Sequence, residues 1–206
     1  MPGLFITFEG VEGAGKSTQI QLLREALAES GLTVYVTREP GGEAVAESIR
    51  AVLLNPAHDI TPTAELLLFL AARAQVTANV IRPRLEAGEI VLCDRYIDST
   101  VAYQGYGRGH DLEMVYRLNE IATGGLIPGM TILLNIDPES GLARQSDRNR
   151  MEAESIDFHR KVRQGFLSES RKNPIRFRVI DAARSVESVH AEILAAVEPL
   201  LPGAAP

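Results

Sequence analysis

The chain has 206 residues, of which 45% are hydrophobic and 23% are charged, and its formal net charge is −6. This length is enough for one large domain whose core needs no disulfide bonds to hold it together. The acidic balance argues against broad, non-specific binding of nucleic acid, which needs a basic face, but it leaves room for a small anionic substrate in a locally basic cleft.

The single cysteine, Cys93, permits no intramolecular disulfide, and a reducing cytoplasm is its natural compartment. The first residues, MPGLFITFEG, lack the basic and apolar regions of a signal peptide, and no run approaches about 18 consecutive apolar residues. We therefore expect a cytoplasmic protein with no membrane span. The histidines are scattered, and none of them forms a metal-ligand spacing with another histidine or with Cys93.

In chain order, short β-rich runs alternate with longer helical ones. Strands are expected at residues 4–9, 33–37, 89–94, 130–137 and 176–181, and helices at 16–29, 43–54, 63–87, 111–123, 138–150, 153–171 and 185–201. The strand runs are mostly continuously apolar, as in parallel strands that are covered on both faces. Their alternation with helices indicates right-handed crossovers. We therefore predict a three-layer α/β fold with a five-stranded parallel sheet and helices on both faces, in one domain spanning residues 1–206 with a disordered tail at about 202–206.

The first expected strand leads into a phosphate-binding loop. It consists of Gly10, Val11, Glu12, Gly13, Ala14, Gly15, Lys16, Ser17 and Thr18, and it matches the full P-loop pattern between a strand and a helix. In such a loop the backbone N–H groups and the helix N-terminus surround the phosphates, Lys16 bridges them, and the Ser17 hydroxyl can ligate Mg²⁺. The motif predicts a P-loop NTPase-type fold that binds a nucleoside triphosphate; an incidental glycine-rich turn is the alternative.

Glu12 places a negative charge in the middle of this loop. Two unit charges about 5 Å apart repel by roughly 3 kcal/mol at an effective dielectric constant near 20. A carboxylate at this position therefore requires a function or a partner that offsets the repulsion.

The loop alone is compatible with a small-molecule kinase, a GTPase-type switch, or a motor or transporter ATPase subunit. A switch should carry a guanine-reading Asn-Lys-x-Asp motif after a strand, and the sequence has none. A motor or transporter subunit would usually show an LSGGQ-like signature or a separate domain, and neither is present. A kinase is therefore the favoured class.

Glycine and proline interrupt the regular elements at residues 38–43, 104–111 and 123–129. The first two of these segments follow or open near a strand end, where open α/β sheets bind their ligands. They are candidates for substrate contact, although turn chemistry alone would also explain them.

Asp94 and Arg95 follow at the carboxyl end of the third expected strand, beside the P-loop. Such a pair either orients a Mg²⁺-bound water and acts in catalysis, or forms a structural salt bridge. The position favours a functional role.

Three stretches in this order and spacing, FITFEGVEGAGKST, VTREPGG and DRYIDSTVAYQGYGRG, resemble the bacterial thymidylate kinase family. The later DRNRMEAESIDFHRKVRQGF resembles that family's lid and the helix after it. The resemblance extends from about residue 4 to residue 200. It implies transfer of the γ-phosphoryl group of ATP, with Mg²⁺, to dTMP, giving dTDP and ADP on the route to dTTP. A different P-loop kinase, acting on another nucleotide or small metabolite, is the alternative.

The resemblance also implies an acceptor site for dTMP. Its residues are Glu12, Arg38, Arg50, Phe69, Arg73, Arg95, Ser99, Thr100, Tyr103 and Gln104. Phe69 would stack on the thymine and Arg73, four residues on, would donate to its O4, whereas simple packing and a surface charge are the competing interpretations. The three arginines Arg38, Arg50 and Arg95 would hold the phosphate. Tyr103 would crowd the sugar 2′ position or merely pack, and Gln104 would lie near the base.

The catalytic residues implied are Glu12, Lys16, Asp94, Arg95, Arg144, Arg148 and Arg150. Glu12 would accept a hydrogen bond from the acceptor 3′-OH. A related subset of the family carries an arginine inside the P-loop, and this chain does not, so the lid at about 143–152 is the expected source of that charge. A solvated helix with alternating charges is the other interpretation of the lid.

Asp94 would act on Mg²⁺ through water, and Glu9, Glu39 and residues 181–183 could touch metal-bound water or adenine. Family members are homodimers, so a homodimer is expected, with ATP and dTMP as small-molecule partners and no nucleic acid or membrane partner.

Overall fold

One sheet of five parallel strands forms the centre of the computed structural model, which describes residues 3–144 and 149–201. The strands are β1 (Phe5–Glu9), β2 (Val34–Arg38), β3 (Ile90–Asp94), β4 (Met130–Asn135) and β5 (Phe177–Asp181), in the order β2-β3-β1-β4-β5. Every neighbouring pair is parallel. Strand β1 lies in the middle and is buried along its whole length. The predicted α/β fold with a five-stranded parallel sheet is confirmed.

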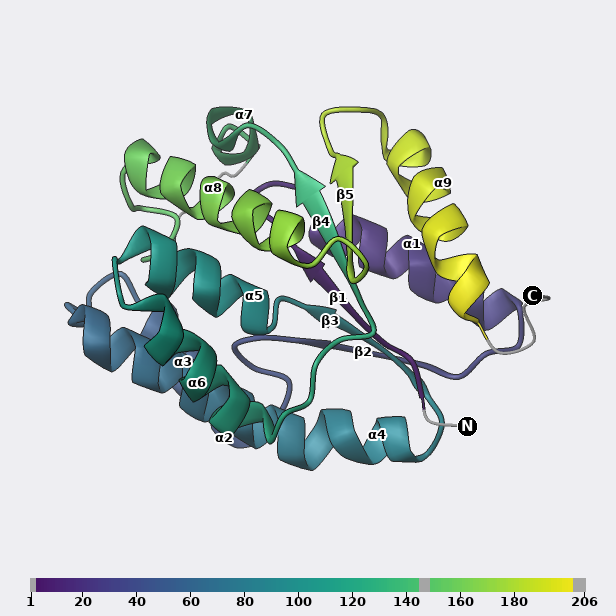
Figure 1. Ribbon diagram of the computed structural model, residues 1–206, viewed down its shortest axis with the longest axis horizontal. Coiled ribbons are helices and arrows are strands. Elements are labelled where there is room, and N and C mark those ends of the chain that lie inside the picture. The colour runs from purple at the N-terminus through teal and green to yellow at the C-terminus, as the bar shows by residue number, and fades with distance from the viewer. Residues whose placement is uncertain (1–2, 145–148, 202–206) are drawn as a thin grey trace.

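Helices cover both faces of the sheet (Figure 1). They are α1 (Lys16–Glu29), α2 (Ala44–Leu54), α3 (Pro62–Val76), α4 (Arg82–Glu86), α5 (Ile97–Thr100), α6 (Leu112–Thr123), α7 (Pro138–Leu142), α8 (Ile156–Lys172) and α9 (Val186–Val197), with the π-helices η1 (Thr77–Ile81) and η2 (Val101–Gly107) and the 3₁₀ helix η3 (Glu198–Leu200). Helices α1 and α9 lie side by side on one face, and α4 and α8 pack against the strands from the other. This arrangement follows from right-handed crossovers between parallel strands.

The helix expected at 63–87 is one continuous helical run with a π-helical segment inside it. The run comprises α3, η1 and α4. Pro83 lacks a backbone N–H and its ring crowds the preceding turn, so the regular hydrogen-bond pattern cannot continue there. A π-helical turn just before the proline accommodates the change.

This run, Pro62–Glu86, is long and apolar enough by composition to cross a membrane, and 44% of its most apolar window is buried in the fold. The core helix of a globular domain satisfies the same test. Two of its charged residues, Glu65 and Arg73, are fully buried and form ion pairs with residues of other elements. These buried ion pairs join the run to the rest of the fold.

The segment 104–111 was expected to be a glycine-rich loop, but the structure continues α5 into the π-helix η2 as far as Gly107. A Cβ atom on Gly107 would lie 2.7 Å from a ring carbon of Phe158, and one on Gly165 would lie 2.8 Å from the ring of Tyr106. These glycines allow η2 and α8 to approach each other closely, so they serve helix packing rather than a turn. The loop prediction was wrong for residues 104–107 for this reason, whereas residues 108–111 form no helix or strand.

The helix expected at 138–150 is much shorter. Helix α7 ends at Leu142, and its last turn tightens into an i→i+3 bond, in which the Arg144 N–H donates to the Gly141 carbonyl at 3.1 Å. Residues 145–148, and with them Arg148, lie outside the described residues, as does the tail at 202–206.

The chain is again described from Asn149, which starts a turn of its own. Its side-chain oxygen accepts from the N–H groups of Met151 and Glu152, and the Glu152 carboxylate accepts from the Asn149 N–H at 2.8 Å. This reciprocal pattern is typical of a helix start rather than of a helix interior, which explains why no helix extends from α7 through this point.

Candidate active site

The P-loop connects the end of β1 to the start of α1 and places Lys16 inside it. Gly10 and Gly13 have φ values of +143° and +68°, which favour glycine. The Lys16 ammonium donates to the carbonyl oxygens of Gly10 and Val11 at 3.2 Å each. Burial lowers the pKa of Lys16, and the cation Arg95 acts in the same direction. The ammonium is thus held within the loop where phosphates are expected to lie.

The Glu12 carboxylate has two donors from outside the loop. Its Oε1 accepts from Arg95 Nη2 at 2.8 Å and from the Tyr103 hydroxyl at 2.9 Å. Burial alone would raise the pKa of Glu12, but the cations Arg95 and Lys16 outweigh it and hold that pKa at about 2. Glu12 is therefore an anion at neutral pH, and its charge is offset by Arg95.

Arg95 is held in an unusual backbone conformation. It is the one non-glycine residue with positive φ, +71°, among those that the structure describes. Its guanidinium also donates to the Gly10 carbonyl at 2.9 Å and to the Ser99 hydroxyl at 3.2 Å. A non-glycine residue in the left-handed region costs free energy and is often found at functional sites. Arg95 is thus fixed to the P-loop through both terminal nitrogens of its guanidinium.

Glu9 forms hydrogen bonds with residues that follow Arg95 in the chain. It is fully buried and accepts from the N–H of Tyr96 at 2.8 Å and from the hydroxyl of Ser99 at 2.5 Å. Burial raises its pKa to about 8, and the nearby anion Asp98 adds to the rise. Glu9 does not line the cavity described below, so its contact is with the start of α5 rather than with ligand space.

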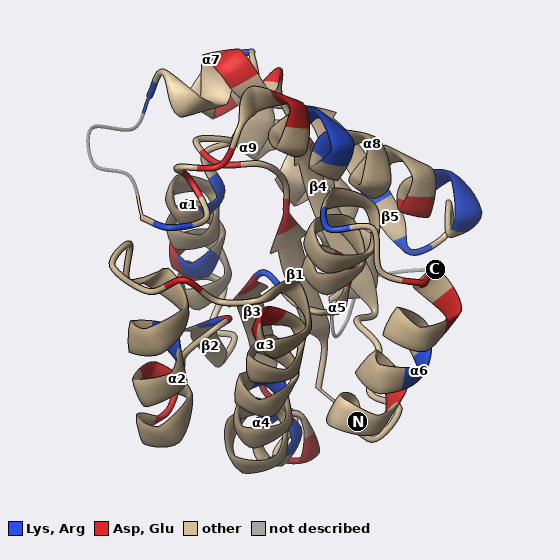
Figure 2. Cartoon of the chain, turned by 90° about the vertical axis from the view of Figure 1, so that its left-hand side faces the viewer, with Lys and Arg blue, Asp and Glu red and all other residues tan. Residues whose placement is uncertain are grey.

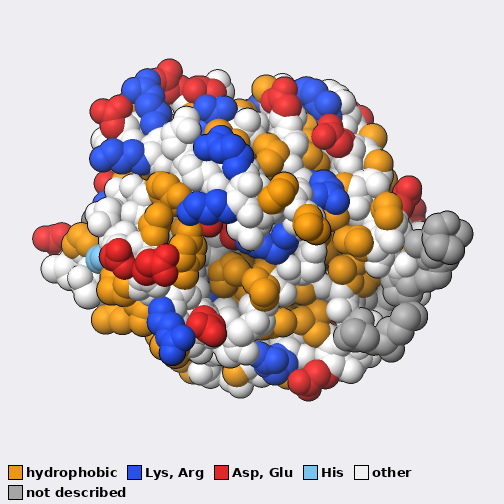
Figure 3. Space-filling view, in the orientation of Figure 1, with side chains coloured by type: hydrophobic (Ala, Val, Ile, Leu, Met, Phe, Trp, Pro, Cys, Tyr) orange, Lys and Arg blue, Asp and Glu red, His pale blue; other side chains and the backbone are white. Residues whose placement is uncertain are grey.

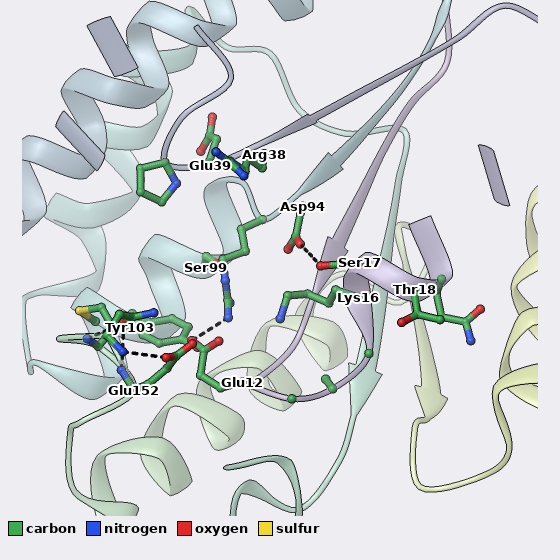
Figure 4. Close-up of a pocket in the computed structure, with 18 of the residues that line it drawn as sticks. Glu12, Lys16, Ser17, Thr18, Arg38, Glu39, Asp94, Ser99, Tyr103 and Glu152 are labelled. Atoms are coloured by element: carbon green, nitrogen blue, oxygen red, sulfur yellow. Dashed lines mark hydrogen bonds and ion pairs between the residues drawn. The ribbon is translucent and has the colours of Figure 1, made fainter. Parts of the chain in front are cut away.

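Ser17 and Asp94 provide oxygen ligands beside the P-loop. The Ser17 hydroxyl donates to Asp94 Oδ2 at 3.3 Å (Figure 4). Hydroxyl and carboxylate oxygens suit Mg²⁺, which keeps several waters and shares its ligands with substrate phosphates. Among the described residues no group of three or more His, Cys, Asp or Glu side chains could hold a metal by itself. The pair therefore fits a magnesium ion that arrives with a nucleotide.

One cavity of about 600 Å³ joins the P-loop to the expected acceptor site. Figure 4 shows Glu12 and Lys16 pointing from the P-loop toward the side of the cavity formed by Ser99 and Tyr103. Its lining includes most of the predicted residues: Glu12, Gly13, Ala14, Gly15, Lys16, Ser17, Thr18, Arg38, Arg50, Phe69, Arg73, Asp94, Arg95, Ser99, Thr100, Tyr103, Gln104 and Arg144, with Glu39 and Ala182. Gly10 and Val11 are not among the lining residues.

Arg73 is enclosed more completely than expected. It is 1% exposed and donates to the Glu39 carboxylate at 2.7 Å, to Thr100 Oγ1 at 2.6 Å, to Asn119 Oδ1 at 2.7 Å and to the Tyr96 carbonyl at 2.9 Å. The interpretation of Arg73 as a surface charge is therefore wrong. Its proposed donation to a thymine O4 stays a prediction.

The other two arginines expected at the acceptor phosphate each have a hydrogen-bond partner close to them in the chain. Arg38 donates to both oxygens of Glu47 at 3.1 and 3.2 Å, and Arg50 donates to the Pro40 carbonyl at 2.7 Å. Both line the cavity. Arg38 is the last residue of β2 and Arg50 belongs to α2, so the segment between these two elements brings both cations to the cavity.

The lid arginines separate into different environments. Arg144 Nη1 donates to the Gly13 carbonyl at 3.2 Å and lines the cavity at the P-loop. Arg150 instead donates to Glu65 Oε2 at 2.7 Å and to the Leu53 carbonyl at 2.7 Å, and it does not line the cavity. Of the two described candidates, Arg144 is the one positioned beside the P-loop.

Backbone contact joins the P-loop to α7, just before the lid. A Cβ atom on Gly13 would lie 1.9 Å from the Gly141 carbonyl oxygen, and one on Gly141 would lie 2.2 Å from the Glu12 carbonyl oxygen. The two glycines therefore pack backbone against backbone with no space for a side chain.

Several cavity residues were not predicted. They are Gln19, Leu54, Arg184, Val186 and Val189, whereas Pro40 lies in the expected contact segment 38–43 and Asn149, Met151 and Glu152 lie in the expected lid. Arg184 and Val186 follow the carboxyl end of β5, a position from which ligand contact could have been anticipated. Gln19 lies in the first turns of α1, and its amide donates to the Val186 carbonyl at 2.9 Å. Nothing in the apolar pattern of Leu54 or Met151 distinguishes them from core residues.

The chain matches the family model described as thymidylate kinase over residues 8–193. It is 51% identical to a thymidylate kinase of Deinococcus radiodurans over 198 residues, which cover 95% of this chain and 96% of the relative. It is 50% identical to a thymidylate kinase of Gloeobacter violaceus, with 96% of each chain covered. The crystal structure of thymidylate kinase from Ehrlichia chaffeensis superposes with a TM-score of 0.81 at 35% identity, covering 96% of this chain and all of that one.

Proposed function

The chain belongs to the thymidylate kinase family, and we propose how its residues divide the work of transferring the γ-phosphoryl group of ATP to dTMP, which gives dTDP and ADP. The observation that supports this division best is the single cavity that runs from the P-loop to Phe69 and Gln104. A donor and an acceptor in one cavity can react directly, without a covalent enzyme intermediate.

At the donor end, the P-loop residues Gly10 to Thr18 bind the triphosphate. Lys16 lies across the phosphates, and the backbone N–H groups at the start of α1 donate to them. The adenine lies toward the segment after β5, where Arg184, Val186 and Val189 line the cavity. A magnesium ion held by Ser17, and by Asp94 through water, would neutralise charge on the phosphates.

At the acceptor end, Phe69 stacks on the thymine and Gln104 faces the edge of the base. Arg95, Arg38 and Arg50 hold the 5′-phosphate so that two anions can approach each other. The acceptor phosphate is already ionised, so the reaction needs no strong general base.

Glu12 belongs to the acceptor side although it is part of the donor loop. Its Oε1 is occupied by Arg95 and Tyr103, and its second oxygen is the one we assign to the acceptor 3′-OH. Tyr103 is thereby held against Glu12, where its ring would crowd a ribose 2′-OH. Ser99 and Thr100 complete the wall beside the sugar and base.

Arg144 supplies positive charge to the transferring phosphoryl group. Its guanidinium donates to the Gly13 carbonyl of the P-loop and lines the cavity there. Arginine directed at charge that develops in the transition state can contribute several kcal/mol. Arg148 lies outside the described residues, and Arg150 would have to leave Glu65 to take this role.

We further infer a cytoplasmic homodimer that acts as one nucleotide-kinase domain per chain. The single buried cysteine suits a reducing compartment. Exposed apolar side chains on α2, α3 and α6, three helices that pack beside one another, support self-association through that side of the molecule.

A coupled ADP-release assay tests the proposed reaction. ATP·Mg²⁺ is offered with dTMP, dUMP, dCMP, dGMP, AMP and CMP in turn. We expect a rate with dTMP, a weaker rate with dUMP because one methyl group discriminates by only about 1–3 kcal/mol, and little with the others. ATP binding with no acceptor used would contradict the proposal.

A further inference from the structure

Glu65 forms the centre of a buried hydrogen-bonded cluster at the acceptor end. It lies in the first turn of α3 and is fully buried. Its Oε1 accepts from Gln104 Nε2 at 2.9 Å and from Arg108 Nε at 3.1 Å, and its Oε2 accepts from Arg108 Nη2 at 2.9 Å and Arg150 Nη1 at 2.7 Å. Four donors thus converge on one carboxylate, which has no role in the phosphoryl transfer described above.

The donors of this cluster are themselves fixed. Arg108 also donates to Glu154 at 2.6 Å, and its guanidinium lies over the Phe158 ring, 4.6 Å from the ring centre. Arg150 also bonds the Leu53 carbonyl. Burial alone would raise the pKa of Glu65, but hydrogen bonds from Arg108, Gln104 and Arg150 outweigh it and hold that pKa below its ordinary value. Glu65 is therefore a fixed anion.

An ionised carboxylate only accepts hydrogen bonds, so it dictates which way the Gln104 amide points. The NH₂ group of Gln104 must face Glu65, because a flipped amide would place its carbonyl oxygen against a carboxylate oxygen. None of the described residues donates to Gln104 Oε1. Gln104 lines the cavity. The amide thus offers its carbonyl oxygen to whatever occupies the acceptor end.

The direction of this amide distinguishes two classes of pyrimidine. Thymine and uracil carry an N–H at ring position 3, whereas cytosine carries an unprotonated nitrogen there. A carbonyl oxygen accepts from the first and is repelled by the second. We propose that Glu65 is a positioning residue that fixes the Gln104 amide and thereby sets the selectivity for thymine and uracil over cytosine. This inference rests on the proposed function, which places the base beside Gln104.

The test compares kcat/KM for dTMP and for dCMP in the wild type and in Glu65→Gln. A glutamine at position 65 can both donate and accept, so the Gln104 amide is free to turn. We expect the dTMP/dCMP ratio to fall at least about tenfold, mainly through a higher KM for dTMP, while the KM for ATP changes less than about twofold.

Two further variants separate orientation from general damage. In a Gln104→Leu background, Glu65→Gln should leave the dTMP/dCMP ratio unchanged, because Glu65 acts through Gln104. The control is Glu169→Gln, which neutralises another buried carboxylate, bonded to Lys172, Tyr106 and Tyr116 and absent from the cavity lining. This control should lower the melting temperature and leave the ratio as in the wild type.

If Glu65→Gln does not fold, Glu65→Asp keeps the negative charge for the arginines and shortens the reach to Gln104, and it should lower the ratio in the same direction. A ratio within about twofold of the wild type in a folded Glu65 variant overturns the role of Glu65. A further drop of the ratio when Glu65→Gln is added to Gln104→Leu also overturns it. A wild-type protein that does not phosphorylate dTMP instead overturns the proposed function itself.

Discussion

Glu12 and Arg95 form an ion pair inside the cavity, with 2.8 Å between Oε1 and Nη2 and only 15% of each side chain exposed. This contact explains how a phosphate-binding loop tolerates a carboxylate. The Arg95 charge offsets the repulsion that Glu12 would exert on a triphosphate. The two residues are 83 positions apart in the chain, so spacing in the sequence could not pair them.

Replacing Arg95 with alanine removes a phosphate-holding cation and leaves Glu12 without its main partner. Truncating one member of a buried charge pair typically costs about 2–5 kcal/mol. We expect kcat/KM for dTMP to fall by about 10² or more in Arg95→Ala, with a much smaller loss of ATP binding. Steady-state kinetics and isothermal titration with ATP measure the two effects.

The double variant Arg95→Ala with Glu12→Gln serves as the control. It removes the unpaired anion, so any loss of ATP affinity caused by repulsion should be recovered while use of dTMP stays poor. Equal losses of ATP and dTMP binding in Arg95→Ala would contradict the assignment of Arg95 to the acceptor.

The pKa of Glu9 predicts a pH dependence of stability. An ordinary glutamate releases its proton near pH 4.5, whereas folded Glu9 holds its proton up to about pH 8. Between these values the folded state binds more protons than the unfolded state, so the free energy of unfolding falls as pH rises, by at most about 1.4 kcal/mol per pH unit. Glu9→Gln should remove this slope.

Urea unfolding at several pH values between 5 and 8 measures the slope in both proteins. The comparison is made between slopes, because Glu9→Gln also changes the hydrogen bond to Ser99. Parallel pH profiles for the wild type and Glu9→Gln would show that Glu9 does not retain its proton in the folded state.

Sequence identified which residues gather at the site but not how each is bonded. The P-loop and Arg95 could be named because motifs place them in a loop and at a strand end, and Gln104 was named from the resemblance to the thymidylate kinase family. The partners of Arg73 and Arg150 could not be named. Arg73 bonds Glu39 and Asn119, which belong to distant parts of the chain, and the preference of Arg150 for Glu65 depends on how α3 packs.

At the scale of elements, the close packing of η2 on α8 depends on glycine. Gly107→Ala places a Cβ 2.7 Å from the Phe158 ring, and overpacking of this kind costs about 1–3 kcal/mol. We expect a lower melting temperature and a displaced Gln104, hence a higher KM for dTMP. Thermal unfolding and steady-state kinetics provide the readouts.

Gly129→Ala is the matched control, because its Cβ would meet its nearest neighbour, Leu4 Cδ1, at an ordinary 3.4 Å. This variant should unfold and turn over dTMP as the wild type does. If Gly107→Ala is equally silent, the helices are not packed as closely as the structure indicates.

The predictions of helices were wrong near glycine and asparagine, because these residues occur both in turns and within or beside helices. The strands begin and end within two residues of their predicted bounds, and α1 has its predicted bounds. A continuously apolar run that leads into a P-loop fits few structures other than a buried strand followed by a helix. The helix η2 was missed because Gly105 and Gly107 give the same local pattern in a turn and in a close helix contact. The end of α7 depends on contact with the P-loop, which no local pattern contains.

For the molecule as a whole, net charge and local charge differ. Basic and acidic residues are interspersed over the chain, and the face in Figure 3 shows both kinds, with apolar and uncharged surface between them (Figures 2 and 3). Yet the cavity is lined by Lys16, Arg38, Arg50, Arg95 and Arg144. A protein with net charge −6 thus collects cations where two phosphorylated substrates are proposed to meet.

The proposed homodimer gives a prediction at the same scale. Exposed apolar side chains lie on α2 (Val45, Val52), α3 (Leu67) and α6 (Met114, Ile121). A charge at the centre of such a face, as in Leu67→Glu, should convert the dimer to monomers. Sedimentation velocity over a range of concentrations measures this change.

Ile175→Glu is the control, because Ile175 is the most exposed large apolar residue of the described chain, at 91%, and belongs to the segment between α8 and β5 rather than to these helices. It should sediment as the wild type does. A wild-type chain that stays monomeric at micromolar concentration would contradict the homodimer.

The contact between Gly13 and Gly141 also limits how this protein can change over generations. Every amino acid that a single-base change can introduce at a glycine codon carries a Cβ atom, and neither position has space for one. Compensation at the partner is impossible, because the partner is already the smallest residue. The two codons are therefore fixed together, and any descendant that loses one of them has to move the whole of α7 away from the P-loop before it can keep the change.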